Sequence, residues 1–126
     1  MKRVIIALIL LFAVLGMSLA AHFTLMKTCD ELTSDLIVVR AAAENANRSD
    51  LRNAVKKTLG DWECRKTLLH ILIHHSLMTD LEISMKKAAY FAENGNLDEV
   101  YAEAENAIEN TAHIKESSTP SISNIF

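Results

Sequence analysis

An uninterrupted apolar run near the start of the chain constrains its fold more than any other feature. Residues Val4 to Ala21 carry no charge, and Ser18 is the only polar side chain among them. This length is about the minimum for a helix that crosses a hydrocarbon core of about 30 Å. In a soluble protein such a run would need cover on every side, and the roughly 100 remaining residues are too few to supply it. The run therefore predicts a membrane-inserted helix.

Two fates of this segment are consistent with the sequence. In the first, residues 1–26 form a permanent signal anchor. In the second, Lys2 and Arg3 are the basic start of a signal peptide, and Ser18-Leu19-Ala20 is a small-x-small cleavage motif. Cleavage near Ala20 would then release a secreted protein. The anchor is favoured because the segment continues beyond the cleavage motif.

Charges on the two sides of the run predict its orientation. Lys2 and Arg3 precede it, whereas Lys27 beyond it is offset by Asp30 and Glu31. The positive-inside bias then places the N-terminus in the cytoplasm and the rest of a single-pass protein outside. The whole chain has a formal net charge of −3, and the part after the run is more acidic still, which argues against nucleic acid as a partner.

The rest of the chain has the composition and periodicity of an all-α protein. The whole sequence contains one proline and three glycines, and no segment alternates as a strand does. Apolar residues recur at helical spacing over 29–46, 50–93 and 96–115. The predicted fold is an N-terminal transmembrane or signal helix followed by an antiparallel bundle of about three helices. The predicted divisions are a membrane segment (1–26), an extracytoplasmic helical domain (27–115) and an irregular C-terminal tail (116–126).

Local signals predict where the chain turns. Thr28 with Glu31 forms a capping box, which predicts a turn near Thr28 at the start of the first bundle helix. Gly60 predicts a bend within the second helix. If that helix, about 66 Å long, folded straight back along a continuous first helix, its charged residues between 71 and 93 would lie beside lipid. We therefore expect that the chain turns near Thr28, that the second helix bends near Gly60, or that the first segment is cleaved, and the capping box favours the turn. Gly95 suits a left-handed turn before the last helix.

Cys29 and Cys64 are the only cysteines. A helical hairpin that turns near Asn47-Arg48 places them within about one helical turn of each other. In an oxidising compartment this spacing is consistent with a disulfide between the first two helices. Two free thiols are the equal alternative.

His70, His74 and His75 form the cluster of side chains most capable of binding a metal or changing charge near neutral pH. His70 and His74 are four residues apart, so on one helix they share a face and are candidates to bind a metal together with His75. No further ligand is evident, and no glutamate follows His70 as it does in metalloproteases. The cluster is also consistent with a pH-responsive patch, or with ordinary polar residues at the edge of the core.

No catalytic constellation is present. The chain has no Gly-rich phosphate loop and no nucleophile elbow. We therefore expect a protein that is not an enzyme and needs no cofactor. The leading interpretation is a membrane-tethered helical interaction or structural module of the cell envelope. The alternative is a metal- or pH-responsive sensor that uses the histidines. The expected partners are the membrane, through the N-terminal segment, and either another protein or a second copy.

Short motifs spread over nearly the whole chain form a recognisable arrangement. They are Trp62, His74-His75-Ser76, Leu81 to Ser84, Tyr90-Phe91, Ala102-Glu103 and Ser123-Asn124-Ile125-Phe126. In this order they resemble the uncharacterised bacterial family known as domain of unknown function 4363. Family members often carry a glutamate after the second histidine, where Ser76 stands here. The resemblance implies a small membrane-anchored protein of Gram-positive bacteria without an assigned activity.

The tail carries three apolar residues, Ile122, Ile125 and Phe126. If it is extended, residues 116–126 reach about 35 Å, far enough to lay these side chains over the apolar girdle around Leu68 to Leu72. We predict that the tail closes the core there. The alternative is that it is a docking peptide for a partner protein.

Overall fold

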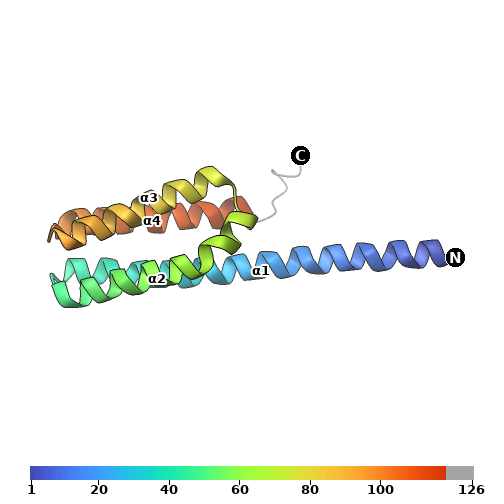
Figure 1. Ribbon diagram of the computed structural model, residues 1–126, viewed down its shortest axis with the longest axis horizontal. Coiled ribbons are helices and arrows are strands. Elements are labelled where there is room, and N and C mark those ends of the chain that lie inside the picture. Colours follow the sequence, from blue (N-terminus) through green and yellow to red (C-terminus); the bar gives the residue numbers. More distant parts are fainter. Residues whose placement is uncertain (119–126) are drawn as a thin grey trace.

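The computed structural model describes residues 1–118, which form four helices joined by short turns. The helices are α1 (Lys2–Glu44), α2 (Arg48–Leu72), α3 (His75–Glu93) and α4 (Leu97–Ser118). No strand occurs within residues 1–118. Figure 1 shows α2, α3 and α4 gathered around the second half of α1, while the first half projects alone. The predicted fold class, a long apolar helix followed by a helical bundle, is confirmed.

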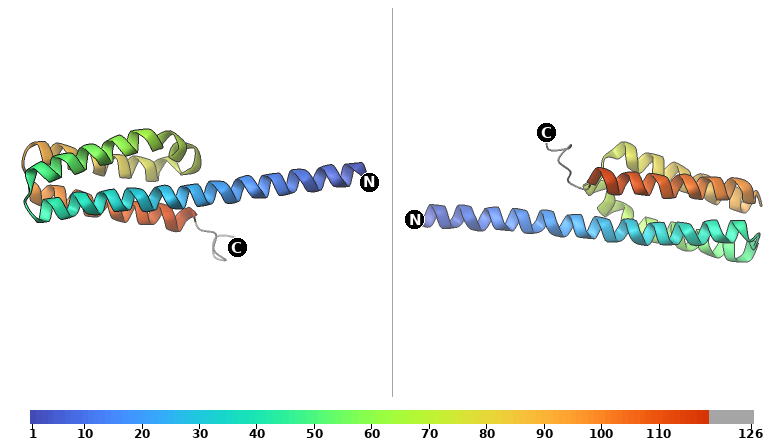
Figure 2. Two further views of the ribbon diagram at one scale, coloured as in Figure 1. Left: turned by 90° about the horizontal axis from the view of Figure 1, so that it is seen from below. Right: turned by 180° about the vertical axis from the view of Figure 1, so that it is seen from behind.

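The bundle is an up-down-up-down arrangement of the second half of α1 with α2, α3 and α4. α1 packs against α2 and α4, and α3 packs against the same two helices, so α1 and α3 lie diagonally across the bundle (Figure 2). Short turns between consecutive helices enforce this antiparallel order. We call the end that carries the α1–α2 and α3–α4 turns the distal end. The end beside the projecting half of α1 is the proximal end.

Two layers of side chains form the core. The proximal layer contains large residues and consists of Leu25, Cys29, Leu32, Leu36, Trp62, Leu69, Met78, Leu81, Met85, Ala107 and Ile114. The distal layer is rich in alanine and consists of Val39, Ala42, Ala43, Leu51, Ala54, Val100 and Ala104. Because the spacing of packed helices follows the size of the side chains between them, the distal layer permits closer approach.

The predicted turn near Thr28 is wrong. α1 continues without a break from Lys2 to Glu44, and Thr28 is buried together with its neighbour Cys29. A capping side chain is useful only where a helix begins and leaves backbone N–H groups without partners. Here the preceding apolar residues already form the helix, so the capping box has no helix start to serve.

The predicted single helix from Asp50 to Glu93 is also wrong. α2 passes through Gly60 without interruption and ends at Leu72, and Ile73 and His74 have extended backbone angles before α3 begins. Isoleucine and histidine are weak helix formers, so a break in this stretch costs little. The reversal lets α3 fold back and bury Met78, Leu81 and Met85, which supplies the driving force.

The remaining turns follow local chemistry. Gly95 has a φ of +73°, which confirms the predicted left-handed turn before the last helix. Asn47 caps α2, because its side-chain oxygen accepts a hydrogen bond from the backbone N–H of Asp50 at 3.1 Å. Asn96 precedes α4 and accepts a longer bond, 3.4 Å, from the N–H of Glu99.

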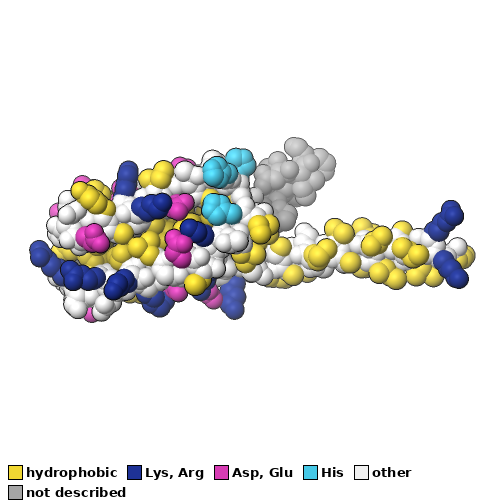
Figure 3. Space-filling view, viewed as in Figure 1, with side chains coloured by type: hydrophobic (Ala, Val, Ile, Leu, Met, Phe, Trp, Pro, Cys, Tyr) yellow, Lys and Arg dark blue, Asp and Glu magenta, His cyan; other side chains and the backbone are white. Residues whose placement is uncertain are grey.

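The projecting half of α1 is apolar all round. Its large side chains from Val4 to Leu19 are exposed, and Figure 3 shows them as an unbroken apolar rod that ends in basic residues. By length and composition this helix is able to cross a membrane. A signal sequence near an N-terminus meets the same two criteria.

Candidate functional site

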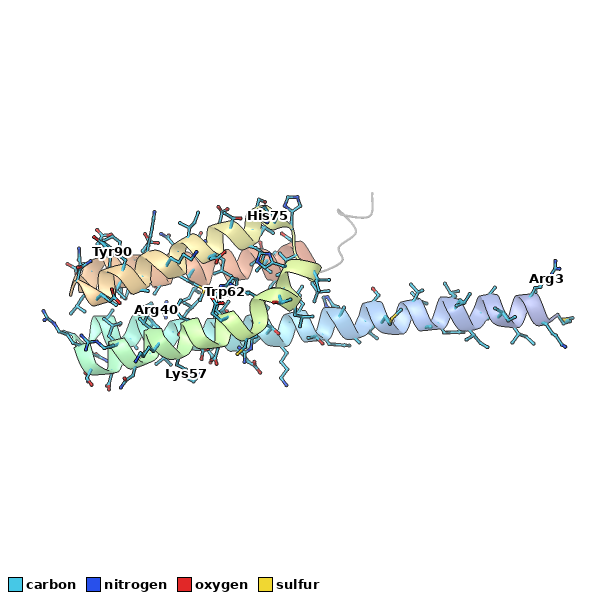
Figure 4. All side chains as sticks on the ribbon, in the orientation of Figure 1. Arg3, Arg40, Lys57, Trp62, His75 and Tyr90 are labelled. Atoms are coloured by element: carbon cyan, nitrogen blue, oxygen red, sulfur yellow. The ribbon has the colours of Figure 1, made fainter. Side chains whose placement is uncertain are left out.

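The three histidines lie at the proximal end of the bundle, where α2 turns into α3. We call residues 68–77 the α2–α3 corner. Figure 3 shows histidine side chains gathered at this end, close to where the apolar rod leaves the bundle, and Figure 4 labels His75 there. The corner exists because the chain reverses after Leu72, so the sequence places its most chemically versatile residues in a turn.

The corner separates the histidines that the sequence suggested would share one helix face. His70 lies in the last turn of α2, and His74 is the residue that caps α3. The Nδ1 atom of His74 accepts a hydrogen bond from the backbone N–H of Ser76 at 3.4 Å and lies 2.9 Å from the Ser76 Oγ. The rings of His70 and His75 have centroids 6.3 Å apart. Within residues 1–118 no three potential ligands gather around one point, so His70, His74 and His75 do not form the suggested metal site.

The corner packs against α1 at the end of the apolar run. Leu72, Ile73, His74 and Leu77 line a cavity of about 320 Å³ together with Ser18, Ala21, His22, Leu25 and Ser117. The α2–α3 corner therefore lies level with residues 18–25 of α1. This contact joins the bundle to the last turns of the apolar segment rather than to a point farther along the helix.

The corner also exposes large apolar side chains. Ile71 is 77% exposed, more than any other large apolar residue in the bundle that the structure describes, and Leu68 is 41% exposed. Exposed apolar side chains are common singly, but here they accompany a stretch without charge. Residues 67–79 contain no Asp, Glu, Lys or Arg, in a chain of which 23% is charged.

A second feature is a charged groove between α1 and α2. The Lys57 ammonium forms ion pairs with the carboxylates of Asp35, at 2.8 Å, and Asp61, at 3.1 Å. Arg65 forms an ion pair with Glu31 at 2.6 Å. Burial raises the pKa of the Asp35 carboxyl despite its bond to Lys57. The pKa of Asp61 is lowered by its hydrogen bonds to Asp35 and then to Lys57.

Two of these ion pairs, Lys57 with Asp35 and Arg65 with Glu31, join α2 to α1. Hydrogen bonds to Asp35 and then to Asp61 raise the pKa of Lys57, so its ammonium remains charged and shared between both carboxylates. This groove was not predicted from the sequence. The hairpin register that relates Cys29 to Cys64 also brings Glu31 opposite Arg65, and that signal was sufficient to find the pair.

Comparison with known proteins gives one match. Residues 19–125 match the family described as "Domain of unknown function (DUF4363)". The chain belongs to this family. The matched range covers the bundle and begins within the apolar run, and it confirms the resemblance carried by the sequence motifs. No curated protein and no solved structure matches the chain.

The two cysteines of this DUF4363 protein occupy opposite environments. Cys29 is 2% exposed in the proximal core layer, whereas Cys64 is exposed on α2, and both are free thiols in the structure. The suggested disulfide is therefore absent here. Its register along the helices is reasonable, but Cys64 follows the core-facing Trp62 by two residues, and two residues rotate a side chain by about 200° on a helix. Burial raises the pKa of the Cys29 thiol to about 11.

The tail residues Ile122, Ile125 and Phe126 lie outside the described residues of this DUF4363 protein, so closure of the core by the tail remains a prediction. α4 ends at Ser118, so it includes the first three residues of the predicted tail, and Ser117 lines the cavity at the corner. The tail therefore starts at the proximal end of the bundle.

Proposed function

We propose that this protein is a membrane-tethered, non-enzymatic module of the bacterial cell envelope that holds a helical bundle at a fixed height and orientation outside the membrane. The observation that carries the proposal is the continuity of α1. One helix is apolar on every side over residues 4–21 and becomes a core helix of the bundle from Leu25 onward. Membrane anchor and bundle thus share a single rigid element.

The continuity of α1 supports a positioned module in preference to a freely moving one. A flexible linker would let the bundle tumble relative to the membrane, whereas an unbroken helix transmits orientation. At 1.5 Å per residue, the stretch from Leu25 to Glu44 raises the distal turns about 30 Å above the end of the span. A bundle held in this way suits contact with a protein partner or a second copy at a defined height.

Charge supports the orientation of the tether. Lys2 and Arg3 lie at the tip of the apolar rod, as Figure 4 shows for Arg3, and the positive-inside bias retains such residues in the cytoplasm. The bundle then faces outward. An acidic domain outside the cell is poorly suited to binding anionic polymers, which favours protein contacts.

The test is the fate of the full-length chain in bacterial cells. We expect an intact mass that includes residues 1–20, found in membranes and resistant to alkaline extraction. Protease added outside protoplasts should digest the bundle. A Leu8→Arg/Leu15→Arg variant should lose membrane retention, since each charge at the centre of a span costs about 3 kcal/mol. A soluble product that lacks residues 1–20 would contradict the tether.

The sensor alternative takes second place. Its support is the proximity of the His70 and His75 rings, 6.3 Å between centroids. Two imidazoles without a third ligand make a weak zinc site. Zinc titration of the full-length protein, with a His70→Ala/His75→Ala control, tests this alternative. Saturable binding that the control lacks would raise the sensor above the structural module.

A further inference from the structure

We infer that the α2–α3 corner is a second membrane contact, with Ile71 seated at the boundary between headgroups and hydrocarbon in the bilayer that α1 spans. The inference rests on the proposed tether. It goes further, because a tether alone would leave the bundle standing clear of the lipid. The partner is the lipid surface itself.

The first argument is depth. If the hydrocarbon core begins at Val4 and is about 30 Å thick, a helix that rises 1.5 Å per residue leaves it near Phe23. The corner lines a common cavity with Ser18, Ala21 and His22. Residues of the corner are therefore level with the last turn inside the hydrocarbon and the first turn outside it. The fold itself lowers this part of the bundle to the membrane surface.

The second argument is the composition of the corner. A protein surface that enters the headgroup region must avoid charges that lose hydration there. Residues 67–79 have no Asp, Glu, Lys or Arg, and Lys66 and Asp80 bound the stretch on either side. The polar side chains within it, histidine, serine and threonine, tolerate a partly hydrated interface. The uncharged stretch thus coincides with the part of α2 and α3 that lies at the depth of the lipid surface.

The third argument is the exposure of Ile71. In water this side chain, 77% exposed at the end of α2, gains nothing from its position. At a bilayer surface the same side chain and the neighbouring Leu68 would be buried among acyl chains. Interfacial binding of this kind grows with the apolar area that is buried.

The experiment measures the depth of three positions in phosphatidylcholine vesicles. Ile71→Cys, Val38→Cys or Leu15→Cys is introduced into full-length Cys64→Ser protein, and the new thiol is labelled with the environment-sensitive fluorophore NBD. Cys29 stays in place because it is buried, and the Cys64→Ser protein without a new cysteine serves as the labelling control. Val38 is the matched control, since it is an exposed apolar residue of the bundle, about 24 Å farther along α1 than His22. Lipids with a doxyl group near the headgroup quench a label at the interface, and lipids with a doxyl group deep in the acyl chain quench a label near the bilayer centre, so quenching by either set reports contact with the bilayer.

We expect the label at position 71 to emit at shorter wavelength than at position 38 and to be quenched several-fold more strongly by doxyl lipid. Equal behaviour at positions 71 and 38, with strong quenching at position 15, would overturn the corner contact and leave the tether intact. A short emission wavelength at position 71 without lipid quenching would also overturn it, since protein, such as the tail, would then cover Ile71. Absence of quenching at position 15 would refute the tether and the corner contact together.

Discussion

The two halves of α1 are continuous in backbone and opposite in surroundings. Over residues 4–19 the large side chains point into open space on every side, whereas from Leu25 onward the buried apolar residues form one stripe that faces α2 and α4. The first half is apolar all round and the second is amphipathic. The comparison shows that a helix need not change its backbone to change its solvent, because the distribution of apolar residues around the axis decides what covers it.

The largest expected difference between the halves concerns leucine truncation. Leu36 is 2% exposed in the proximal core layer, so Leu36→Ala should lower the free energy of unfolding by about 2–5 kcal/mol. Leu15 is 55% exposed in the projecting half, and Leu15→Ala should leave bundle stability unchanged. Urea unfolding of both full-length variants in mild detergent, followed by circular dichroism, measures this. Equal destabilisation would mean that residue 15 packs against the bundle.

Thiol reactivity sharpens the description of the second half. At about pH 8 Cys64 should react with iodoacetamide as a free thiol does, and Cys29 more than about tenfold more slowly, because it is buried and a raised pKa leaves little thiolate. Its pKa of about 11 means that alkylation of Cys29 should accelerate as the pH rises toward that value. Mass spectrometry of timed samples resolves the two sites. In urea the rates should converge; equal rates in the native protein would place Cys29 outside the core.

Glycine replacement locates the border of the cooperative unit. Gly60 and Gly16 are both helical, and neither has an atom of another part of the protein where a Cβ would lie. Gly60→Ala in α2 should stabilise the bundle by about 1 kcal/mol through helix propensity. Gly16→Ala should not alter bundle unfolding, because the projecting half does not unfold with it. A matching gain at both sites would extend the cooperative unit into the apolar half.

The smallest effect concerns the charged groove. Asp35 has a raised pKa in the folded state, so its contribution to stability is fully present below the unfolded pKa of 3.8 and is lost as the pH rises through the folded value. The Asp35→Asn variant does not lose stability in this way, because its side chain does not ionise. The stability of the variant relative to wild type should therefore improve as the pH rises from acid toward neutral. Urea unfolding across that range checks the sign, and a change in the opposite direction would show that the bond to Lys57 outweighs burial.

Much of the fold could be predicted because its signals are local and repeated. Apolar residues at helical spacing predicted the helical stretches, and Gly95 predicted a left-handed turn that the structure contains. The predictions failed where a local signal depended on its neighbours. The capping box at Thr28 lies inside a helix, and the break at Ile73 and His74 has no glycine or proline to mark it.

The candidate site was harder to predict for the same reason. The spacing of His70 and His74 suggested a shared face only if the helix continued through both, and that condition fails at Leu72. The spacing of Cys29 and Cys64 along the helices suited a disulfide, whereas the position of Cys64 off the apolar stripe made two free thiols the equal alternative, and only the structure decides between them. The α2–α3 corner could not be identified at all, since it depends on which residues of α1 the reversed chain meets.

The sequence by itself determined an apolar segment able to enter a membrane, a helical composition and membership of the DUF4363 family, because each depends on residue type and spacing along the chain. Tertiary structure decided the continuity of α1, the reversal after Leu72 and the level of the corner beside residues 18–25. These features arise from the burial of side chains that are distant in sequence. A weak local preference for helix, as at Ile73, yields to the larger gain in free energy from closing a common core.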